Sequence, residues 1–456
     1  MQNWPHFDQL SLEPSPEEWR ALVEQIALFL NDELVALGSE PVVHDDVEEA
    51  TGSRDLAAYL KSIFEPGFNP AHPGFMAYIP GGGLVTSALA DWIIKTMNRY
   101  GTAHFAAPSL ADLEHQVVHM FADWVGYGPG YAGVLTTGGS LANFTALVTA
   151  RRAMLPEDFL GGVIYCSDQT HHSVMKAANL AGFSSRNMRM IASNSNFQLD
   201  IEALREQIEQ DLDSEMTPFL VVGSAGTTNT GSIDPLPEMA ALAQTHNLWF
   251  HVDAAYGGAF LLTQRGRERL AGIAEADSVT LDPHKGLFLP YGTGGILVRN
   301  KDRLLEAHEM RGDYMPDLDR ERAHLDPFSL SVELSREHRG LKVALPFMLH
   351  GKDAFQAALD EKLDLTNWLY ETLSGIDQIE IVNAPELSTF AFKQKGADEG
   401  QNRALMERIN GKGRVYLSAT ILNGEFVIRV SILSHRTHKR DVEHLVSDLR
   451  MALEEM

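Results

Sequence analysis

Residues 277–290 read DSVTLDPHKGLFLP and place Lys285 directly after a run that has the composition of a buried strand. Lysine is strongly hydrated and is rarely fully buried unless it has a partner. Two interpretations are therefore open. The lysine either lies at a strand end with its head in water, or it holds an amine in a low-dielectric pocket, where a neutral amine can form a Schiff base. The rest of the chain has to decide between them.

Short apolar runs alternate with helical patterns from about residue 75 to residue 300. Near-continuous apolar runs are typical of strands that helices cover on both faces. The sequence therefore predicts an α/β fold with a mainly parallel sheet. The predicted strands are YAGVLTT, GGVIYCS, MRMIAS, PFLVVGSAG, LWFHVDAA, SVTLDP and GGILVRN.

The two ends of the chain differ from this central part. Ser15-Pro16-Glu17-Glu18 is a typical helix start, with a capping box and a proline in the first turn. Near the C-terminus, STFAFK, RVYLSATIL and GEFVIRVSIL predict strands, Asn423-Gly424 predicts a tight turn, and an amphipathic helix follows Thr437. We expect a helical arm over residues 1–72, a large α/β domain over 73–345 and a small α+β domain over 346–456.

Composition narrows the possible partners and the compartment. The net charge of −25 argues against nucleic acid or an anionic membrane as the main partner. The first residues lack a signal-peptide pattern, and no apolar run is long enough to predict a membrane-spanning helix. The single cysteine, Cys166, excludes an intrachain disulfide framework and a cysteine-based zinc site. We therefore expect a cytoplasmic protein.

A glycine-containing turn, TTGGS at residues 136–140, lies between a predicted strand and a predicted helix. Two glycines let the backbone approach a ligand closely, Ser140 can cap the helix, and a helix N-terminus favours a dianion. The alternative is an ordinary strand-to-helix turn with a serine cap. The turn is not a P-loop, because no Gly-Lys-Ser/Thr ending is present. Residues 128–133 match GxGxxG but precede their strand, so they do not predict a dinucleotide site.

His171 and His172 follow the predicted strand GGVIYC, where ligands of α/β proteins bind. An imidazole at this place can stack on a flat heteroaromatic ring. The alternatives are a helix cap and half of a metal pair. Adjacent histidines point in different directions, and no cysteine or carboxylate cluster supports a metal, so we expect none.

Asp253 ends the predicted strand LWFHVD beside the small residues Ala254 and Ala255. A desolvated carboxylate needs a cationic or hydrogen-bonding partner, such as a protonated pyridine nitrogen, although a capping aspartate is the alternative. Lys285 follows 32 residues later, one strand further on. Parallel strands thus bring an acid and an amine to the same edge of the sheet. Together with a dianion-binding turn and a stacking imidazole, these are the groups that pyridoxal 5′-phosphate requires.

The ordered set of motifs resembles the group II pyridoxal-phosphate-dependent amino-acid decarboxylases, in particular their aromatic-L-amino-acid branch. The resemblance covers most of the chain from about residue 70 onward. It implies the type I, aspartate-aminotransferase-like fold with a mainly parallel seven-stranded sheet, and a homodimer with its active sites at the subunit interface. The stretches that carry the resemblance are HPGFMAYIPGGG, LTTGGSLANFTAL, YCSDQTHHSV, GSAGTTNTGSID, HVDAAYGGAF and DPHKGLFLPYG.

The resemblance also implies roles for individual residues. Lys285 matches the Schiff-base lysine, Asp253 the partner of the pyridinium nitrogen, and His171 the stacking histidine. Tyr314, 29 residues past the lysine, matches a mobile-loop tyrosine that protonates the substrate carbon after CO2 leaves. Relatives that release an aldehyde commonly have phenylalanine there, so Tyr314 favours simple decarboxylation. Further cofactor contacts are implied for Gly139, Ser140, Thr228, Ala255, Asp282 and His284.

The substrate is the least determined part of the prediction. Phe75, Tyr78 and Pro80 resemble the pocket-lining segment of the aromatic branch, which implies an aromatic L-amino acid such as tryptophan, tyrosine, DOPA or phenylalanine. An apolar pocket separates close analogues by only ~1–3 kcal/mol per small group. The alternatives are a small acidic or diamino substrate (glutamate, aspartate or 2,4-diaminobutyrate), a lyase or aldehyde-forming enzyme of the same fold, and a binding module without enzymatic activity.

Overall fold

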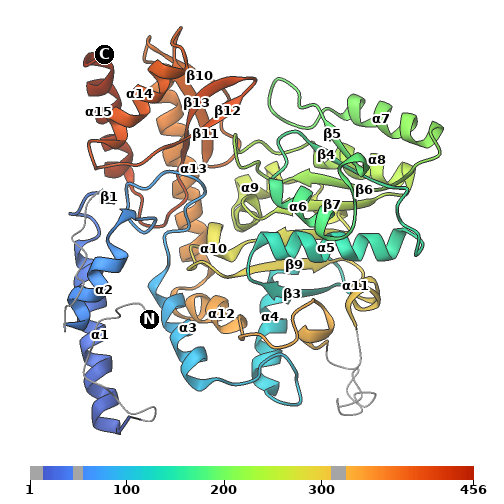
Figure 1. The fold of residues 1–456 in the computed structure, drawn as a ribbon, viewed down its shortest axis with the longest axis horizontal. Coiled ribbons are helices and arrows are strands. Elements are labelled where there is room, and N and C mark those ends of the chain that lie inside the picture. The colour runs from blue at the N-terminus through green and yellow to red at the C-terminus, as the bar shows by residue number, and fades with distance from the viewer. Residues whose placement is uncertain (1–13, 45–54, 310–324) are drawn as a thin grey trace, which may run out of the picture.

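The computed structural model describes residues 14–44, 55–309 and 325–456, with a seven-stranded sheet at its centre (Figure 1). The strands lie in the order β3-β9-β8-β7-β6-β4-β5. Neighbours from β8 to β5 pair in parallel, whereas β9 is antiparallel to both β8 and β3. The predicted mainly parallel sheet is therefore confirmed, and each apolar run overlaps one of its strands. These strands are β3 (Ala132–Thr136), β4 (Gly162–Ser167), β5 (Met188–Ile191), β6 (Thr217–Ser224), β7 (Trp249–Ala254), β8 (Ser278–Leu281) and β9 (Gly294–Val298).

Helices cover both faces of this sheet, which explains why its strands are apolar without alternation. Along β4, Val163 and Tyr165 belong to the core on one face, whereas Ile164 and Cys166 belong to the core on the other. Helices α5 (Gly139–Met154), α6 (His172–Leu180) and α11 (Lys301–His308) pack on the Cys166 side. The opposite side packs against α4 (Pro108–Val125), α7 (Ile201–Asp213) and α8 (Leu236–His246).

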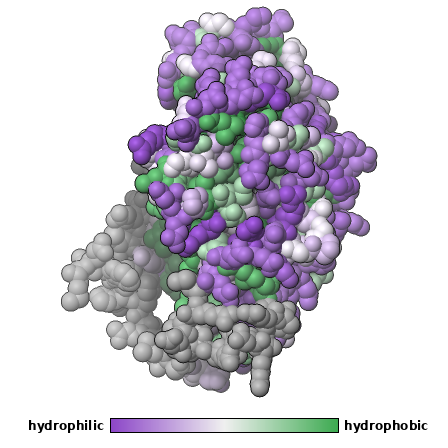
Figure 2. All heavy atoms as spheres, turned by 90° about the vertical axis from the view of Figure 1, so that its right-hand side faces the viewer, coloured by the Kyte–Doolittle hydropathy of each residue, from purple (hydrophilic) through white to green (hydrophobic). Residues whose placement is uncertain are grey.

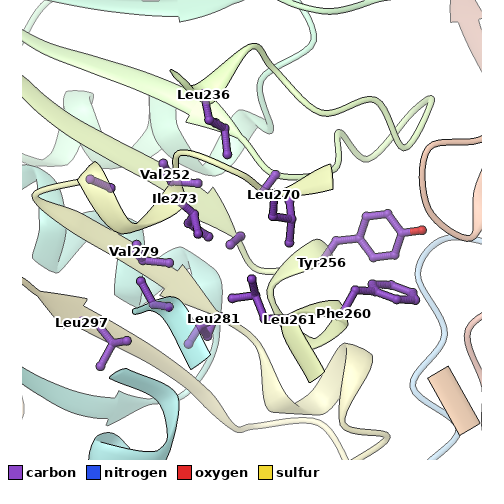
Figure 3. Close-up of a cluster of buried hydrophobic side chains, with 14 of the residues drawn as sticks. Leu236, Val252, Tyr256, Phe260, Leu261, Leu270, Ile273, Val279, Leu281 and Leu297 are labelled. Atoms are coloured by element: carbon purple, nitrogen blue, oxygen red, sulfur yellow. The ribbon is translucent and has the colours of Figure 1, made fainter. Parts of the chain in front are cut away.

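Part of the core on the α8 side is shown in Figure 3, where Val252 of β7 and Val279 of β8 lie among leucine side chains from the neighbouring helical segments. Leu236 and Leu270 are at most 1% exposed there. Full burial of one such side chain contributes about 1.5–3 kcal/mol. This packing fixes β7 and β8, the two strands that lead to Asp253 and Lys285.

A second, antiparallel sheet lies in the C-terminal part, in the order β10-β11-β13-β12. The predicted turn is present, since Asn423 and Gly424 both have positive φ. The helix after Thr437 buries its predicted apolar face, including Val442, Leu445 and Leu449. The sequence did not predict β10, because three residues are too few to give a pattern. The elements are β10 (Ile379–Ile381), β11 (Thr389–Gln394), β12 (Ser418–Leu422), β13 (Glu425–Ser431), α12 (Gly340–His350), α13 (Lys352–Ser374), α14 (Glu399–Asn410) and α15 (Lys439–Glu454).

The N-terminal helix α1 (Pro16–Ala36) begins with the predicted capping box and has no buried residue. It lies at the side of the molecule away from the seven-stranded sheet (Figure 1). Helix α2 (Leu56–Phe64) also buries none of its side chains. A two-stranded ladder, β1 (Val43–His44) with β2 (Gly67–Phe68), and helix α3 (Val85–Met97) complete this region. The two boundaries between the three predicted domains stay predictions.

Hydrophilic side chains cover most of the face that looks away from α1 (Figure 2). This distribution agrees with the excess of 62 acidic over 37 basic residues. None of the helices in the described ranges combines the length and apolarity needed to cross a membrane.

Candidate active site

The predicted cofactor residues line one cavity of about 380 Å³. The cavity lies where β6, β7 and β8 end and helix α5 begins. The structure thus brings together residues that the sequence separates by up to 146 positions. Phe75, Tyr78 and Pro80 are not among the lining residues, and Tyr314 lies outside the described residues. The predicted residues on the cavity wall are Gly139, Ser140, His171, Thr228, Asp253, Ala255, Asp282, His284 and Lys285.

Lys285 lies on the short helix α10 (Pro283–Gly286), directly after β8. Its Nζ is 3.1 Å from Asp282 Oδ2, and the Asp282 side chain is only 2% exposed. His284 Nε2 is 3.6 Å from the same oxygen. The other oxygen, Asp282 Oδ1, is buried without a hydrogen-bond partner in the described structure. The lysine head therefore faces a buried carboxylate on the cavity wall.

The start of α5 forms another part of the wall. Gly138 is the N-cap of this helix and no side chain caps it, so the predicted Ser140 cap is wrong. The reason is that the carbonyl of Gly138 already accepts from the N–H groups of Leu141 and Ala142, which places Ser140 inside the first turn. A Cβ atom on Gly139 would be 2.9 Å from Asp282 Oδ2. A side chain at position 139 would therefore come too close to Asp282. The N–H groups at the uncapped helix start favour an anion.

Asp253 is nearly buried at the end of β7, with 9% of its surface exposed. Its Oδ1 accepts from the backbone N–H of Ala255 at 3.1 Å, and its Oδ2 accepts from Asn143 Nδ2 at 2.8 Å. Asn143 belongs to α5 and also lines the cavity, but the sequence reasoning missed it. The available signal was an amide at a sheet-facing position of the helical pattern SLANFTAL.

His171 combines two of the predicted alternatives, because it lines the cavity and is also the N-cap of α6. Its Nδ1 accepts from the backbone N–H of Ser173 at 3.3 Å and is 2.8 Å from Ser173 Oγ. Burial lowers the pKa of His171, and the nearby Asp253 opposes that shift. The ring is therefore held in place by the helix start while it faces the cavity.

Four aromatic rings pack together, and Arg429 of β13 connects one of them, Tyr78, with the cavity wall. Arg429 Nη2 donates to the carbonyls of Tyr78 at 3.0 Å and Thr228 at 2.5 Å. Burial lowers the pKa of this guanidinium to about 10. Sequence reasoning missed Arg429, although an arginine inside the apolar strand FVIRVSIL was a signal. The rings are Phe68, Phe75, Tyr78 and Tyr416.

The segment that contains Tyr78 and Pro80 approaches the backbone of His284 and Lys285 at Gly81. Tyr78 has φ 54° and is 52% exposed, so a bulky residue occupies the left-handed region at the edge of the site. Such a conformation costs of order 1–3 kcal/mol and persists only where its surroundings hold it. Gly81, the residue after Pro80, lies so near that an added Cβ would be 2.2 Å from the carbonyl oxygen of His284.

Comparison with known proteins decides the family. Residues 39–395 match the pyridoxal-dependent decarboxylase conserved domain. The chain belongs to this family. The decarboxylase is 31% identical to an aromatic-L-amino-acid decarboxylase of Bacillus atrophaeus over 98% of both chains.

Solved structures give the fold. The TDC of Oryza sativa, crystallised with PLP and tryptamine, matches with a TM-score of 0.91 at 24% identity, over 98% of this chain and 100% of that one. The glutamate decarboxylase domain of a Vibrio parahaemolyticus diaminobutyrate-pyruvate transaminase and L-2,4-diaminobutyrate decarboxylase matches with 0.83, also at 24% identity, over 99% and 98%. The predicted type I, aspartate-aminotransferase-like fold is therefore confirmed.

Pyridoxal phosphate is the cofactor of the decarboxylase, and the observed cavity fits it. Space for a phosphate is left by Gly138 and Gly139, where added Cβ atoms would approach His284 and Asp282 within 3.2 Å and 2.9 Å. A carboxylate, Asp253, and an amine, Lys285, lie on the walls of the same cavity. The buried and unpartnered Asp282 Oδ1 marks a position where a hydrogen-bonding group of a ligand is expected.

Proposed function

We propose that this decarboxylase removes CO2 from an aromatic L-amino acid and releases the amine. The observation that carries the substrate assignment is the group of four aromatic rings that Arg429 connects with the cofactor cavity. Tyr78 is half exposed, and Phe75 and Tyr416 stack with ring centroids 5.6 Å apart and an interplanar angle of 9°. Arg429 donates hydrogen bonds both to the carbonyl of Tyr78 in this group and to the carbonyl of Thr228 on the cavity wall. Flat rings provide apolar area and stacking geometry that favour another aromatic ring.

The charges on the cavity wall argue against an acidic substrate. Among the lining residues that the structure describes, Lys285 is the only lysine or arginine, and Asp282 already pairs with it. The side-chain carboxylate of glutamate or aspartate would need a further cationic partner once it was desolvated. Similarity of fold does not separate the substrates, because the Oryza sativa and Vibrio parahaemolyticus proteins match with comparable TM-scores.

Bound pyridoxal phosphate supplies an electron sink for the pair that remains when CO2 departs. In our proposal Lys285 holds the cofactor covalently, and the first turn of α5 with Gly139 and Ser140 binds its phosphate. Asp253 holds a proton at the pyridine nitrogen, and His171 stacks on the ring. Thr228, Ala255, Asp282 and His284 complete the wall around the cofactor, as predicted from the sequence.

Tyr314 is proposed to return a proton to the α-carbon of the substrate. A protonated carbon leaves as the amine, whereas an unprotonated carbon can lose two electrons to dissolved O2, which is reduced to hydrogen peroxide, and hydrolysis then releases the aldehyde and ammonia. We therefore expect Tyr314→Phe to shift the products from amine toward aldehyde and ammonia. Tyr131→Phe is the control, because Tyr131 bonds to His119, far from the predicted loop in the sequence. Unchanged products in Tyr314→Phe would contradict this assignment.

The experiment that tests the substrate is CO2 release over a panel of amino acids, with amine and ammonia measured in parallel. The panel comprises tryptophan, tyrosine, DOPA, phenylalanine, glutamate, aspartate and 2,4-diaminobutyrate. We expect kcat/KM for the best aromatic substrate to exceed that for glutamate by about 10²-fold, the discrimination that ~3 kcal/mol of lost contacts gives. Higher kcat/KM for glutamate or 2,4-diaminobutyrate would overturn the aromatic assignment and leave the decarboxylase family unaffected.

The cytoplasmic location stays a prediction. We further propose that two copies of the chain form the active enzyme. Helix α1 supports the dimer, since it buries no residue although it carries large apolar side chains. The exposed ones are Trp19, Leu28, Leu30, Leu34 and Val35. Sedimentation velocity should give a dimer, and the pair Leu30→Asp and Leu34→Asp should weaken it. A wild-type monomer with full activity would contradict the proposal.

A further inference from the structure

A line of buried polar side chains runs through the sheet to Asp253. Trp249 Nε1 donates to Ser278 Oγ at 2.8 Å, and Ser278 Oγ is 2.8 Å from His251 Nδ1. His251 Nε2 is 3.1 Å from Asn143 Oδ1, and Asn143 Nδ2 donates to Asp253 Oδ2 at 2.8 Å. None of the five side chains belongs to a residue more than 9% exposed. The links from Trp249 to Asn143 are therefore buried in the protein, and the last link, from Asn143 to Asp253, reaches the cavity wall.

The chemistry of the end groups fixes the direction of each hydrogen bond. A carboxylate only accepts, so Asn143 presents its NH2 group to Asp253 and its oxygen to the opposite side. That oxygen also accepts from Thr280 Oγ1 at 2.7 Å. His251 must then carry its proton on Nε2 to donate to the same oxygen. An indole only donates, so Ser278 accepts from Trp249 and gives its own proton to His251 Nδ1.

The histidine in this line is therefore neutral. Burial lowers the pKa of His251 to about 4, which agrees with a ring that holds one proton at neutral pH. All four donors point the same way, toward Asp253, and each polarises the next. A flipped Asn143 amide would place two acceptors in contact at Asp253 and a donor against the Nε2–H of His251. The line thus admits one orientation of the amide.

We propose that Asn143 is a positioning residue that holds the Asp253 carboxylate in its ionised form, so that the pyridine nitrogen of the cofactor carries the proton. His251 and Thr280 lock the Asn143 amide in the orientation that this requires. The proposal rests on the role of Asp253 given above. It adds a property that the cavity wall alone does not determine, namely the protonation state of the cofactor ring. The observation behind this proposal is the hydrogen bond from Asn143 Nδ2 to Asp253 Oδ2 at 2.8 Å, which Asn143→Leu removes.

The test uses holoenzyme reconstituted with pyridoxal phosphate that carries ¹⁵N in the ring, and reads the chemical shift of that nitrogen. The wild type should show a protonated nitrogen. Asn143→Leu should move the shift toward the unprotonated position and lower kcat by about 10²-fold with a smaller change in KM. The reason is that a neutral ring is a weaker electron sink, and Asn143 acts on the ring through Asp253.

Two controls separate positioning from structural damage. Thr149→Val removes a buried hydroxyl from the same helix α5, where Thr149 bonds to the Thr145 carbonyl at 2.7 Å and takes no part in the line. It should keep the wild-type shift. His251→Gln can still donate to Asn143 from its amide and should keep most of the shift, whereas His251→Leu should lose part of it. These histidine variants also test the proposal if Asn143→Leu does not fold.

Asp253→Asn distinguishes failure of this inference from failure of the proposed site. If Asp253→Asn moves the nitrogen shift while Asn143→Leu and His251→Leu keep the wild-type value, the positioning role is wrong and the site stands. If Asp253→Asn keeps the wild-type value as well, Asp253 is not the partner of the ring, and its proposed role fails together with this inference.

Discussion

The cofactor end and the aromatic end of the site are built in different ways. At the cofactor end, Asp253 is almost fully buried and receives two hydrogen bonds within 3.1 Å. At the aromatic end, Tyr78 is half exposed in a left-handed backbone conformation. The cofactor end is therefore pre-organised by buried hydrogen bonds. The aromatic end is partly exposed, and a residue of the C-terminal sheet, Arg429, bonds to its backbone.

The difference follows from where the residues lie in the chain. The cofactor end uses the ends of neighbouring strands and the helix that packs on them, all within residues 136–285. The aromatic end depends on Arg429, which reaches Tyr78 across 351 positions of sequence. Local motifs therefore encode the chemistry, whereas long-range packing sets the surroundings of the substrate.

The largest expected effect is the loss of activity in Lys285→Ala. Removing the amine that we propose to hold the cofactor should lower kcat/KM by about 10³-fold or more. Lys439→Ala is the control, because its side chain is 67% exposed and contacts Glu443 and the Trp368 ring, which are not among the cavity-lining residues. The initial rate of CO2 release measures both. Wild-type activity in Lys285→Ala would contradict the proposed role of Lys285. The cofactor end would then contain no essential amine, and the comparison between the two ends would fail.

Arg429→Met should act on the aromatic end. It removes the hydrogen bonds to the partly buried carbonyls of Tyr78 and Thr228, at a cost of ~1–3 kcal/mol each. We expect the free energy of unfolding to fall by about 3 kcal/mol and KM for an aromatic substrate to rise by about 10-fold, with a smaller change in kcat. Arg440→Met, whose side chain is 70% exposed, is the control. Chemical denaturation and steady-state kinetics measure these effects. An unchanged KM would show that Arg429 does not influence substrate binding.

Gly139→Ala should weaken the cofactor end alone. Its Cβ would come within 2.9 Å of Asp282 Oδ2 and 3.3 Å of Ala255 Cβ, so the space for the phosphate narrows. We expect the Kd for pyridoxal phosphate to rise by roughly 10-fold, the effect of ~1.4 kcal/mol. Gly128→Ala is the matched control, because an added Cβ meets nothing within 4 Å there. Equal Kd values in both variants would show that the glycine turn does not bind the cofactor.

The smallest expected effect is on stability in acid. Burial lowers the pKa of both His251 and His308 to about 4, so each binds a proton more readily in the unfolded chain. Above pH 6.5, the ordinary pKa of histidine, both side chains are neutral in the folded and in the unfolded chain, and they do not affect stability. As the pH falls from 6.5 toward 4, the unfolded chain binds protons that the folded chain does not, so the free energy of unfolding decreases. At pH 5, His251 should account for about 2 kcal/mol.

Urea unfolding at neutral and acidic pH checks this effect. His251→Gln and His308→Gln should each reduce the loss of stability in acid. His308 bonds to Thr149 at 3.1 Å, away from the cofactor, so His308→Gln should keep the wild-type absorbance of the cofactor. An acid loss of stability that is unchanged in both variants would place the responsible groups elsewhere.

The sequence predicted the fold and the lining of the cavity better than the contacts within it. The strands of the large sheet were evident because burial on both faces makes them continuously apolar, as in β4. Asn143 and Arg429 were missed because each is a single polar residue within an apolar pattern, and its partner comes from another element. Ser140 was predicted as a helix cap, yet the N-cap residue is Gly138, and no side chain caps the helix. Hydrogen bonds between distant segments have no local signal.

The central claim is a covalent link between pyridoxal phosphate and Lys285 in the cavity that Asp253 also lines. The most direct measurement is borohydride reduction of the yellow holoenzyme, followed by mass spectrometry of the peptide that contains residues 277–290. The account predicts that Lys285 carries the reduced cofactor and that the visible absorbance is lost. A label on a different lysine, or a colourless protein that does not take up added cofactor, would contradict it.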